Sequence, residues 1–179
     1  MSEPYPHIDR WILPRAALSA TLTGVQKEGQ SVREAGALWL GPRNNAAGIT
    51  SVVFPTANGV KATAGQWKVS PELFGVVTRW AKPQGLSLLG VVHTHLHGVP
   101  PRLSRADRQY SVQVPDILAV VIGEAGHELD YRNWGWYLYE KNAYRQLPTQ
   151  ELTKRFEITS QNVDLRCADA DTIRELDPE

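Results

Sequence analysis

The chain has 179 residues, of which 42% are hydrophobic and 21% are charged. These values are ordinary for a globular protein, so they exclude a wholly disordered, collagenous or coiled-coil chain. The length predicts one domain with a sizeable core. Nineteen basic residues balance nineteen acidic ones, which argues against a nucleic-acid binder driven by electrostatics alone.

Cysteine content and apolar runs bear on the compartment. The chain has one cysteine, Cys167, which excludes an intrachain disulfide and a cysteine-based zinc site and favours a reducing compartment. Residues 1–10 contain no apolar signal-peptide core, and no stretch of about 18 apolar residues occurs in the sequence. We therefore expect a cytoplasmic protein that is neither exported nor inserted in a membrane.

Apolar periodicity and turn residues predict a mixture of strands and helices. In chain order we expect a strand over 8–13, a helix over 15–27, a hairpin of two strands over 34–41 and 48–54, a flexible loop over 55–68, a helix over 70–80, a strand over 86–95, a helix over 104–113, a strand over 117–122 and a final hairpin strand over 134–139. The hairpin strands are apolar on both faces, so we place them centrally. This mixture indicates an α/β or α+β domain.

The C-terminal part of the chain differs in charge from the rest. Residues 148–179 hold eight acidic and four basic residues. We therefore divide the chain into a main domain over 1–147 and an acidic extension over 148–179, packed on or trailing from the same domain. The polar segment 169–179 is expected to be a surface helix or a frayed terminus.

The densest chemistry lies at the end of the strand predicted over 86–95. Residues two apart in an extended chain point to the same face, so His93 and His95 can direct both imidazoles to one point. Ser104 opens the sequence Ser-Arg-Ala-Asp as a candidate helix cap, and Asp107 follows one turn along that helix. Two imidazoles and one carboxylate match the ligand set of a catalytic zinc site, which leaves a fourth position for water.

A zinc-activated water also needs a group that accepts its proton. Glu34 is the best candidate for this general base because it is an acid at the start of an apolar strand; the alternative is a solvated strand end. The Ser104 hydroxyl is a candidate donor to the oxyanion of a tetrahedral intermediate, besides or instead of capping the helix. We expect His97 to lie exposed on the loop that follows the ligand pair.

The chain resembles the JAMM (JAB1/MPN) metallopeptidase family in three motifs, which are Glu-Ala-Gly-Ala-Leu-Trp-Leu-Gly from Glu34, His-Thr-His at 93–95 and Ser-Arg-Ala-Asp at 104–107. The resemblance implies one zinc ion per chain, with ligands His93, His95 and Asp107. It also implies a general base at Glu34 and an oxyanion-stabilising role for Ser104. The family pattern has seven residues between the second histidine and the serine, whereas this chain has eight.

The same resemblance implies a fold and a substrate. The family fold is a curved mixed β-sheet flanked by helices, similar to the deaminase fold, and residues 1–147 would form the catalytic domain. Family members hydrolyse peptide or isopeptide bonds, commonly after the C-terminal glycine of ubiquitin or a ubiquitin-like protein. The compact form looks like prokaryotic members, some of which act in antiphage conjugation systems. The implied partner is therefore a ubiquitin-like protein or its conjugates, with no nucleic acid and no membrane.

Three further residues are candidates for substrate binding. Trp67 lies in a segment, 57–68, that in the family can cover an extended substrate tail by adding a strand, and Arg102 and Arg105 can meet acidic groups of a protein substrate. The competing hypothesis is a catalytically silent scaffold of the same fold that only binds partners. A zinc deaminase is excluded because the sequence lacks the His-x-Glu and Pro-Cys-x-x-Cys motifs.

Overall fold

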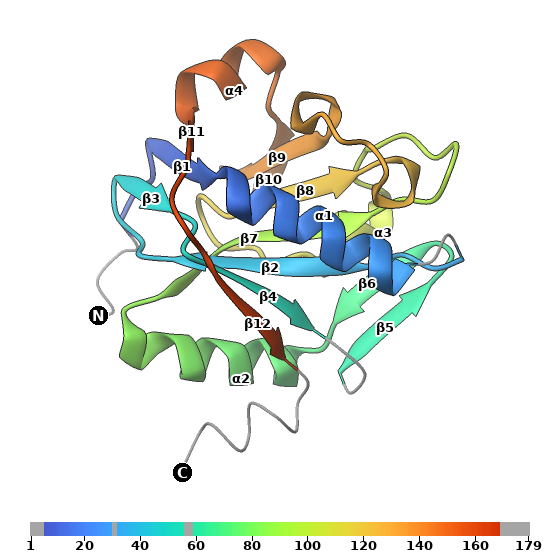
Figure 1. Cartoon of the computed structure of the whole chain (residues 1–179), viewed down its shortest axis with the longest axis horizontal. Coiled ribbons are helices and arrows are strands. Elements are labelled where there is room, and N and C mark those ends of the chain that lie inside the picture. Colours follow the sequence, from blue (N-terminus) through green and yellow to red (C-terminus); the bar gives the residue numbers. More distant parts are fainter. Residues whose placement is uncertain (1–5, 30–31, 56–58, 169–179) are drawn as a thin grey trace.

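The structure is a computed structural model that describes residues 6–29, 32–55 and 59–168. Within these residues the chain forms a mixed α/β fold around a seven-stranded sheet of order β10-β9-β8-β7-β2-β4-β12 (Figure 1). The strands of this sheet are β2 (Gly36–Gly41), β4 (Ser51–Pro55), β7 (Ser87–Thr94), β8 (Leu118–Ile122), β9 (Gly135–Glu140), β10 (Ala143–Gln146) and β12 (Asp164–Ala168). Parallel pairs join β7 to β8 and β12 to β4, and the other neighbours are antiparallel.

Smaller sheets and helices surround this central sheet. The strands β1 (Arg10–Pro14), β3 (Ala46–Gly48) and β11 (Phe156–Thr159) form a parallel three-stranded sheet, and β5 (Val60–Thr63) pairs with β6 (Gln66–Val69). The helices are α1 (Arg15–Gly29), α2 (Pro71–Ala81), α3 (Arg105–Tyr110) and α4 (Thr149–Arg155), with short 3-10 turns at Lys82–Gln84, Glu124–Gly126 and Tyr131–Asn133. Among the described residues, no helix is both long enough and apolar enough to cross a membrane.

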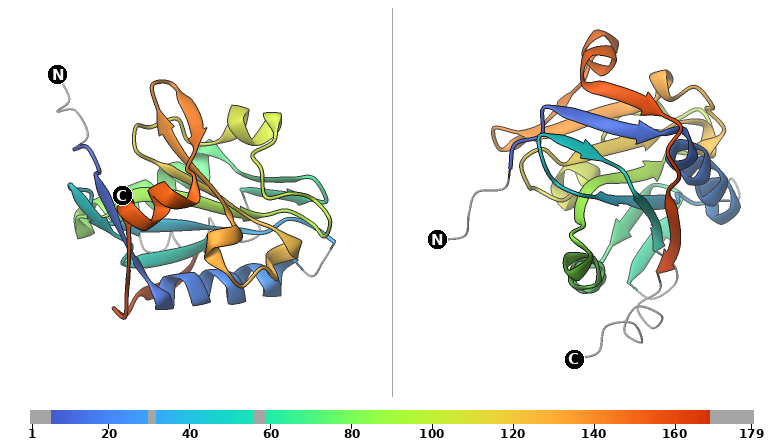
Figure 2. Two further views of the ribbon diagram at one scale, coloured as in Figure 1. Left: turned by 90° about the horizontal axis from the view of Figure 1, so that it is seen from above. Right: turned by 60° about the vertical axis from the view of Figure 1, so that its left-hand side comes forward.

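Two hydrophobic cores cover opposite faces of the central sheet. Alternate residues of a strand point to opposite faces, and in β2 Trp39 packs in the core that contains α1, whereas Leu38 and Leu40 pack in the core that contains α2. Figures 1 and 2 show α1 and α2 on different sides of β2. The prediction that the strands near 34–41 and 48–54 are buried on both faces and form an antiparallel pair is confirmed.

The segment predicted as a flexible loop over 55–68 is different in the structure, and that prediction is wrong. Residues 60–69 form the β5–β6 hairpin, with Ala62 opposite Trp67, while residues 56–58 lie outside the described part. The physical reason is an alternation within β6: Trp67 and Val69 are buried, and Gln66 and Lys68 are partly exposed. This period of two is the signature of a half-buried strand.

The C-terminal elements also differ from the prediction. The strand near 134–139 is not the last one, because α4, β11 and β12 follow it. β11 pairs with β1 and β12 pairs with β4, so residues from 156 onward enter both larger sheets. The predicted helix over 104–113 is shorter and ends at Tyr110. The prediction for 169–179 lies outside the described residues.

Candidate metal centre

The C-terminal end of β7 carries the two predicted histidine ligands. β7 lies between β2 and β8 in the sheet, so the end of this strand is enclosed on both sides. His93 and His95 are 4% and 5% exposed, and their ring centroids are 5.2 Å apart. The structure therefore brings the two imidazoles together, as the spacing along the strand predicts.

The short helix α3 brings Asp107 to the same point. Ser104 caps the helix: its hydroxyl accepts the Asp107 N–H at 3.1 Å, while the Asp107 carboxylate accepts the Ser104 N–H at 2.7 Å. This capping box fixes the carboxylate at the helix start. Asp107 lies with Oδ1 3.6 Å from His93 Nε2 and with Oδ2 3.5 Å from His95 Nε2.

The extra loop residue between His95 and Ser104 does not displace Asp107. The loop begins with a turn in which the Val99 N–H donates to the Leu96 carbonyl, and Gly98 adopts a left-handed φ of 75°. This conformation is one that glycine adopts without steric cost. The Pro100 carbonyl then reaches back and lies 2.9 Å from Nδ1 of His95. The longer loop thus orients the His95 ring through the Pro100 carbonyl.

Glu34 lies just before β2 and is 5% exposed. Ligand atoms of Glu34, His93 and His95 all lie within 4.8 Å of one another, and this buried group could bind a metal ion. Burial raises the pKa of Glu34, although the nearby histidines and a backbone hydrogen bond from Trp67 oppose that shift. A buried carboxyl with a raised pKa is a better proton acceptor and donor near neutral pH than a solvated one.

The distances within the cluster fit a metal ion better than direct hydrogen bonds. Zinc–ligand distances of about 2.0–2.1 Å place tetrahedral ligands roughly 3.3 Å apart, which is close to the 3.5 and 3.6 Å between Asp107 and the imidazoles. Nε2 of His93 is buried and has no hydrogen-bond partner among the described residues. Buried polar atoms are rarely left unpaired, so this atom points to a missing ligand.

The charges of the cluster are mutually supporting. Burial would raise the pKa of Asp107, but its interactions with the His93 and His95 rings and with Ser104 hold the pKa well below its ordinary value. Burial would lower the pKa of His95, but the Asp107 carboxylate and the Pro100 carbonyl outweigh burial and raise it. Asp107 is therefore ionised and available as an oxygen ligand.

Trp67 is placed against the cluster by a glycine. Its indole stacks parallel to the His93 ring, with centroids 6.5 Å apart. A Cβ atom at Gly36 would lie 2.4 Å from the Val92 carbonyl oxygen and 2.6 Å from Trp67 Cε2, so a larger residue there would force both the neighbouring strand and the indole to shift. Sequence reasoning singled out Trp67 but not Gly36, although the Glu-Ala-Gly motif contains this glycine.

The cleft beside the cluster lies between β6 and α3. His93 and Asp107 line it together with Trp67 and Tyr110, and Lys68 Nζ sits 3.9 Å from the centroid of the Tyr110 ring. The two predicted arginines, Arg102 and Arg105, are exposed on either side of Ser104, which is itself exposed.

His97 lies outside the cluster, as expected. Its side chain is 54% exposed, and its Nδ1 is 2.9 Å from Glu124 Oε2.

Comparisons with known proteins inform the fold. No protein-family model matches the sequence, and no curated protein matches it significantly. The solution structure of protein DSY2949 from Desulfitobacterium hafniense is similar with a TM-score of 0.60 and 14% identity, over 85% of this chain and 94% of that one. The crystal structure of AF2198, a JAB1/MPN domain protein from Archaeoglobus fulgidus, is similar with a TM-score of 0.45 and 18% identity, over 76% and 95%. The first likeness shows a shared fold.

Proposed function

We propose that this protein is a zinc-dependent peptidase or isopeptidase that cleaves after the C-terminal glycine of a ubiquitin-like modifier. The observation that carries the proposal is the buried cluster of His93, His95 and Asp107, which has metal-ligand spacing and an unpaired Nε2, with Glu34 beside it. The same four residues carry the motif resemblance to the JAMM metallopeptidases. One zinc ion per chain is the expected cofactor.

Zinc in this cluster would act as a Lewis acid and would lower the pKa of water to about 7. His93, His95 and Asp107 hold the ion in this proposal, and the Pro100 carbonyl fixes the ring of His95 through Nδ1. Such an outer partner sets which ring nitrogen faces the metal.

Glu34 accepts the proton of the attacking water and passes it to the leaving amine. Its buried position, which raises its pKa, supports both halves of that transfer. The Ser104 hydroxyl accepts the Asp107 N–H at 3.1 Å, and its own proton remains available for a developing oxyanion.

The cleft between β6 and α3 is the proposed site for the modifier tail. Trp67 forms one wall and Tyr110 lies on the other, so a tail without side chains near the scissile bond fits best. The β5–β6 hairpin offers an extended segment along which a tail can add as a strand. Arg102 and Arg105 are exposed next to Ser104 and would meet acidic groups of the substrate.

A catalytically silent scaffold would be favoured if the extra residue between His95 and Ser104 displaced Asp107. The Asp107 carboxylate lies 3.5 Å and 3.6 Å from the two imidazoles, which supports the peptidase proposal over the scaffold. A cytoplasmic role in a bacterial conjugation system, including antiphage defence, remains part of the proposal.

The test is cleavage of a panel of fusions in which ubiquitin-like modifiers with glycine-ended tails precede a reporter protein. We expect the zinc-loaded protein to release the reporter from at least one fusion, and a chelator to abolish release until zinc is restored. A matched control is Thr78→Ala on α2, which removes an exposed hydroxyl that donates to the Phe74 carbonyl. Absence of cleavage across the panel by zinc-loaded protein would contradict the proposed substrate class.

A further inference from the structure

Thr94 lies between the two histidine ligands and is only 1% exposed. Alternation along β7 sends its side chain to the face opposite that of His93 and His95. The Thr94 hydroxyl accepts the Ala35 N–H at 3.0 Å, and the Thr94 N–H donates to the Ala35 carbonyl at 2.8 Å. This threonine therefore holds the residue that directly follows Glu34.

The Ala35 N–H donates to a side-chain hydroxyl, whereas in a regular sheet it would donate to a main-chain carbonyl. In an antiparallel ladder, a paired residue donates its N–H to the carbonyl of its partner. The register of β2 and β7 ends at Gly36 opposite His93, and at the next residue a side-chain oxygen takes the N–H. The Ala35 N–H is thus paired while the chain at Glu34 leaves the ladder.

The other side of Glu34 is held by the β5–β6 hairpin. The Glu34 N–H donates to the Thr63 carbonyl at 2.8 Å. The segment 34–35 therefore lies between β7 on one side and β5 on the other. Among the described residues, the side-chain hydrogen bond to the Ala35 main chain on the β7 side comes from Thr94.

We infer that Thr94 is a positioning residue that sets the location of Glu34 through the main chain of Ala35. The expected effect of Thr94 on catalysis rests on the proposed function, which assigns Glu34 as the general base. Thr94 does not touch the reacting atoms. Its hydroxyl keeps the chain at Glu34 in place relative to the imidazoles of His93 and His95, the residues on either side of Thr94.

The test compares Thr94→Val, which keeps the shape but removes the hydroxyl, with Thr94→Ser, which keeps the hydroxyl. We expect amide hydrogen exchange in the peptide over 33–38 to be about tenfold faster in Thr94→Val, because the Ala35 N–H loses its acceptor. Thr94→Ser should keep the protection of the original protein. Thr78→Val is the matched control, since it removes a hydroxyl in α2 and should leave this peptide unchanged.

Kinetics and metal content give the second arm of the test. We expect Thr94→Val to lower kcat about 10- to 100-fold at unchanged KM, a size typical of groups that orient a catalytic residue, and to retain about one zinc per chain. Thr94→Ser should restore kcat. If Thr94→Val does not fold by circular dichroism, Thr94→Ala makes the same comparison without the β-branched bulk.

Unchanged exchange over 33–38 in the variants that lack the hydroxyl would overturn the inference. Loss of zinc from folded Thr94→Val would also overturn it, because Thr94 would then act on the histidines rather than on Glu34. If the original protein cleaves no fusion, the proposed function fails, while the exchange measurement still decides whether Thr94 holds the segment at Glu34.

Discussion

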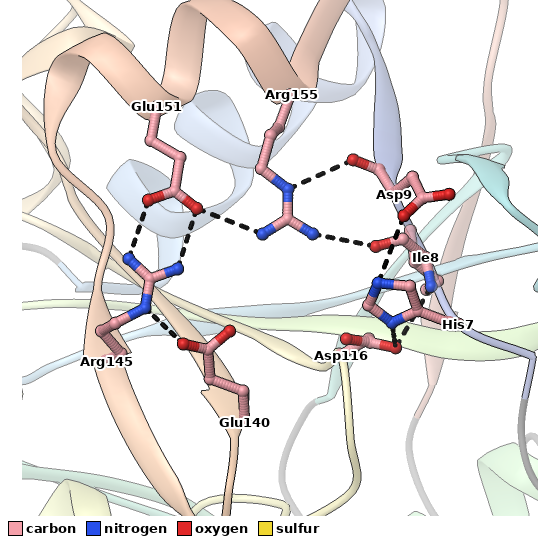
Figure 3. Close-up of polar contacts among 8 residues, drawn as sticks. All are labelled: His7, Ile8, Asp9, Asp116, Glu140, Arg145, Glu151 and Arg155. Atoms are coloured by element: carbon pink, nitrogen blue, oxygen red, sulfur yellow. Dashed lines mark hydrogen bonds and ion pairs between the residues drawn. The ribbon is translucent and has the colours of Figure 1, made fainter.

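The buried His93/His95/Asp107 cluster and the ion network around Arg145 both gather charged residues, but their groups are paired differently. Arg145 in β10 donates two hydrogen bonds to the Glu151 carboxylate, at 2.7 and 2.8 Å, and also contacts Glu140 (Figure 3). Arg155 bonds the same Glu151 and the carbonyls of Ile8 and Asp9. In this network the guanidinium groups donate directly to oxygen atoms.

The buried cluster shows the opposite pattern. The imidazole nitrogens and the Asp107 oxygens lie 3.5 and 3.6 Å apart, and His93 Nε2 has no hydrogen-bond partner among the described residues. Burying polar groups without partners is costly, whereas the partly exposed Arg145 network pairs its groups directly. The difference supports the proposal that the cluster holds a metal ion, whereas the network is satisfied by its own groups.

The largest expected effect comes from the proton acceptor beside the cluster. Glu34→Ala should lower cleavage of a modifier fusion about 10²- to 10⁴-fold, because the attacking water loses its general base. The measurement is a steady-state assay with zinc content determined on the same sample. Full activity would reassign the base, and loss of zinc would make Glu34 a ligand. As a control, Glu140→Ala removes a carboxylate from the Arg145 network and should leave the rate of fusion cleavage unchanged.

The next effect is the gain in stability when zinc binds. Zinc at 100 times its dissociation constant should raise the free energy of unfolding by about 2.7 kcal/mol, which corresponds to a rise of roughly 5–10 °C in Tm for a chain of this size. Thermal unfolding with and without a chelator measures this rise. Asp107→Asn should reduce the rise, and Arg145→Ala should keep it. An equal rise in Asp107→Asn and the original protein would place the ion elsewhere.

Breaking the complete network should have a smaller effect. Arg145→Ala should lower the free energy of unfolding by about 1 kcal/mol, since partly exposed ion pairs are screened by solvent. Denaturant unfolding gives this value. Arg10→Ala is the control, because Arg10 pairs with Glu157 at the surface and its loss should cost less. A loss of several kcal/mol in Arg145→Ala would show that the network carries more of the fold than its exposure implies.

Lowering the pH should reduce the contribution of the Arg145 network to the free energy of unfolding by less than the Arg145→Ala substitution does. Arg145, helped by Arg155, lowers the pKa of Glu151 to about 2. Because this folded-state pKa lies below the unfolded value, the stabilisation is present above pH ~4.5 and is lost as the pH falls toward 2. Denaturant unfolding between pH 6 and pH 3, as conditions to test, should show a smaller loss in Arg145→Ala than in the original protein. Equal losses would contradict the assignment.

The sequence predicted the cluster because its key spacings are local. The separation of His93 and His95 decides that they share a strand face, and Ser104 with Asp107 forms a capping box within one helical turn. The meeting of these two elements depends on the loop between them, whose course the residue pattern does not specify. Glu34 was a candidate because it is an acid at the start of an apolar strand, and the motif resemblance implies the same role; it lies 59 residues before His93, and no local signal links it to the histidines.

The parts that the sequence did not predict depend on contacts made far along the chain. The β5–β6 hairpin is short, and its half-buried alternation was hidden among the glycine and alanine residues around Gly65. β11 and β12 lie within the acidic extension over 148–179 but pair with β1 and β4, so tertiary pairing outweighs local composition. The need for glycine at position 36 follows from its close approach to the Trp67 indole, which the sequence does not indicate.

The most direct test is an elemental determination of zinc in protein prepared with the metal in excess and then freed of unbound ions. Our account gives about one zinc per chain, falling to nearly none when His95 is replaced by alanine. A zinc content near zero in the unaltered chain would contradict the central claim that His93, His95 and Asp107 together hold a single ion.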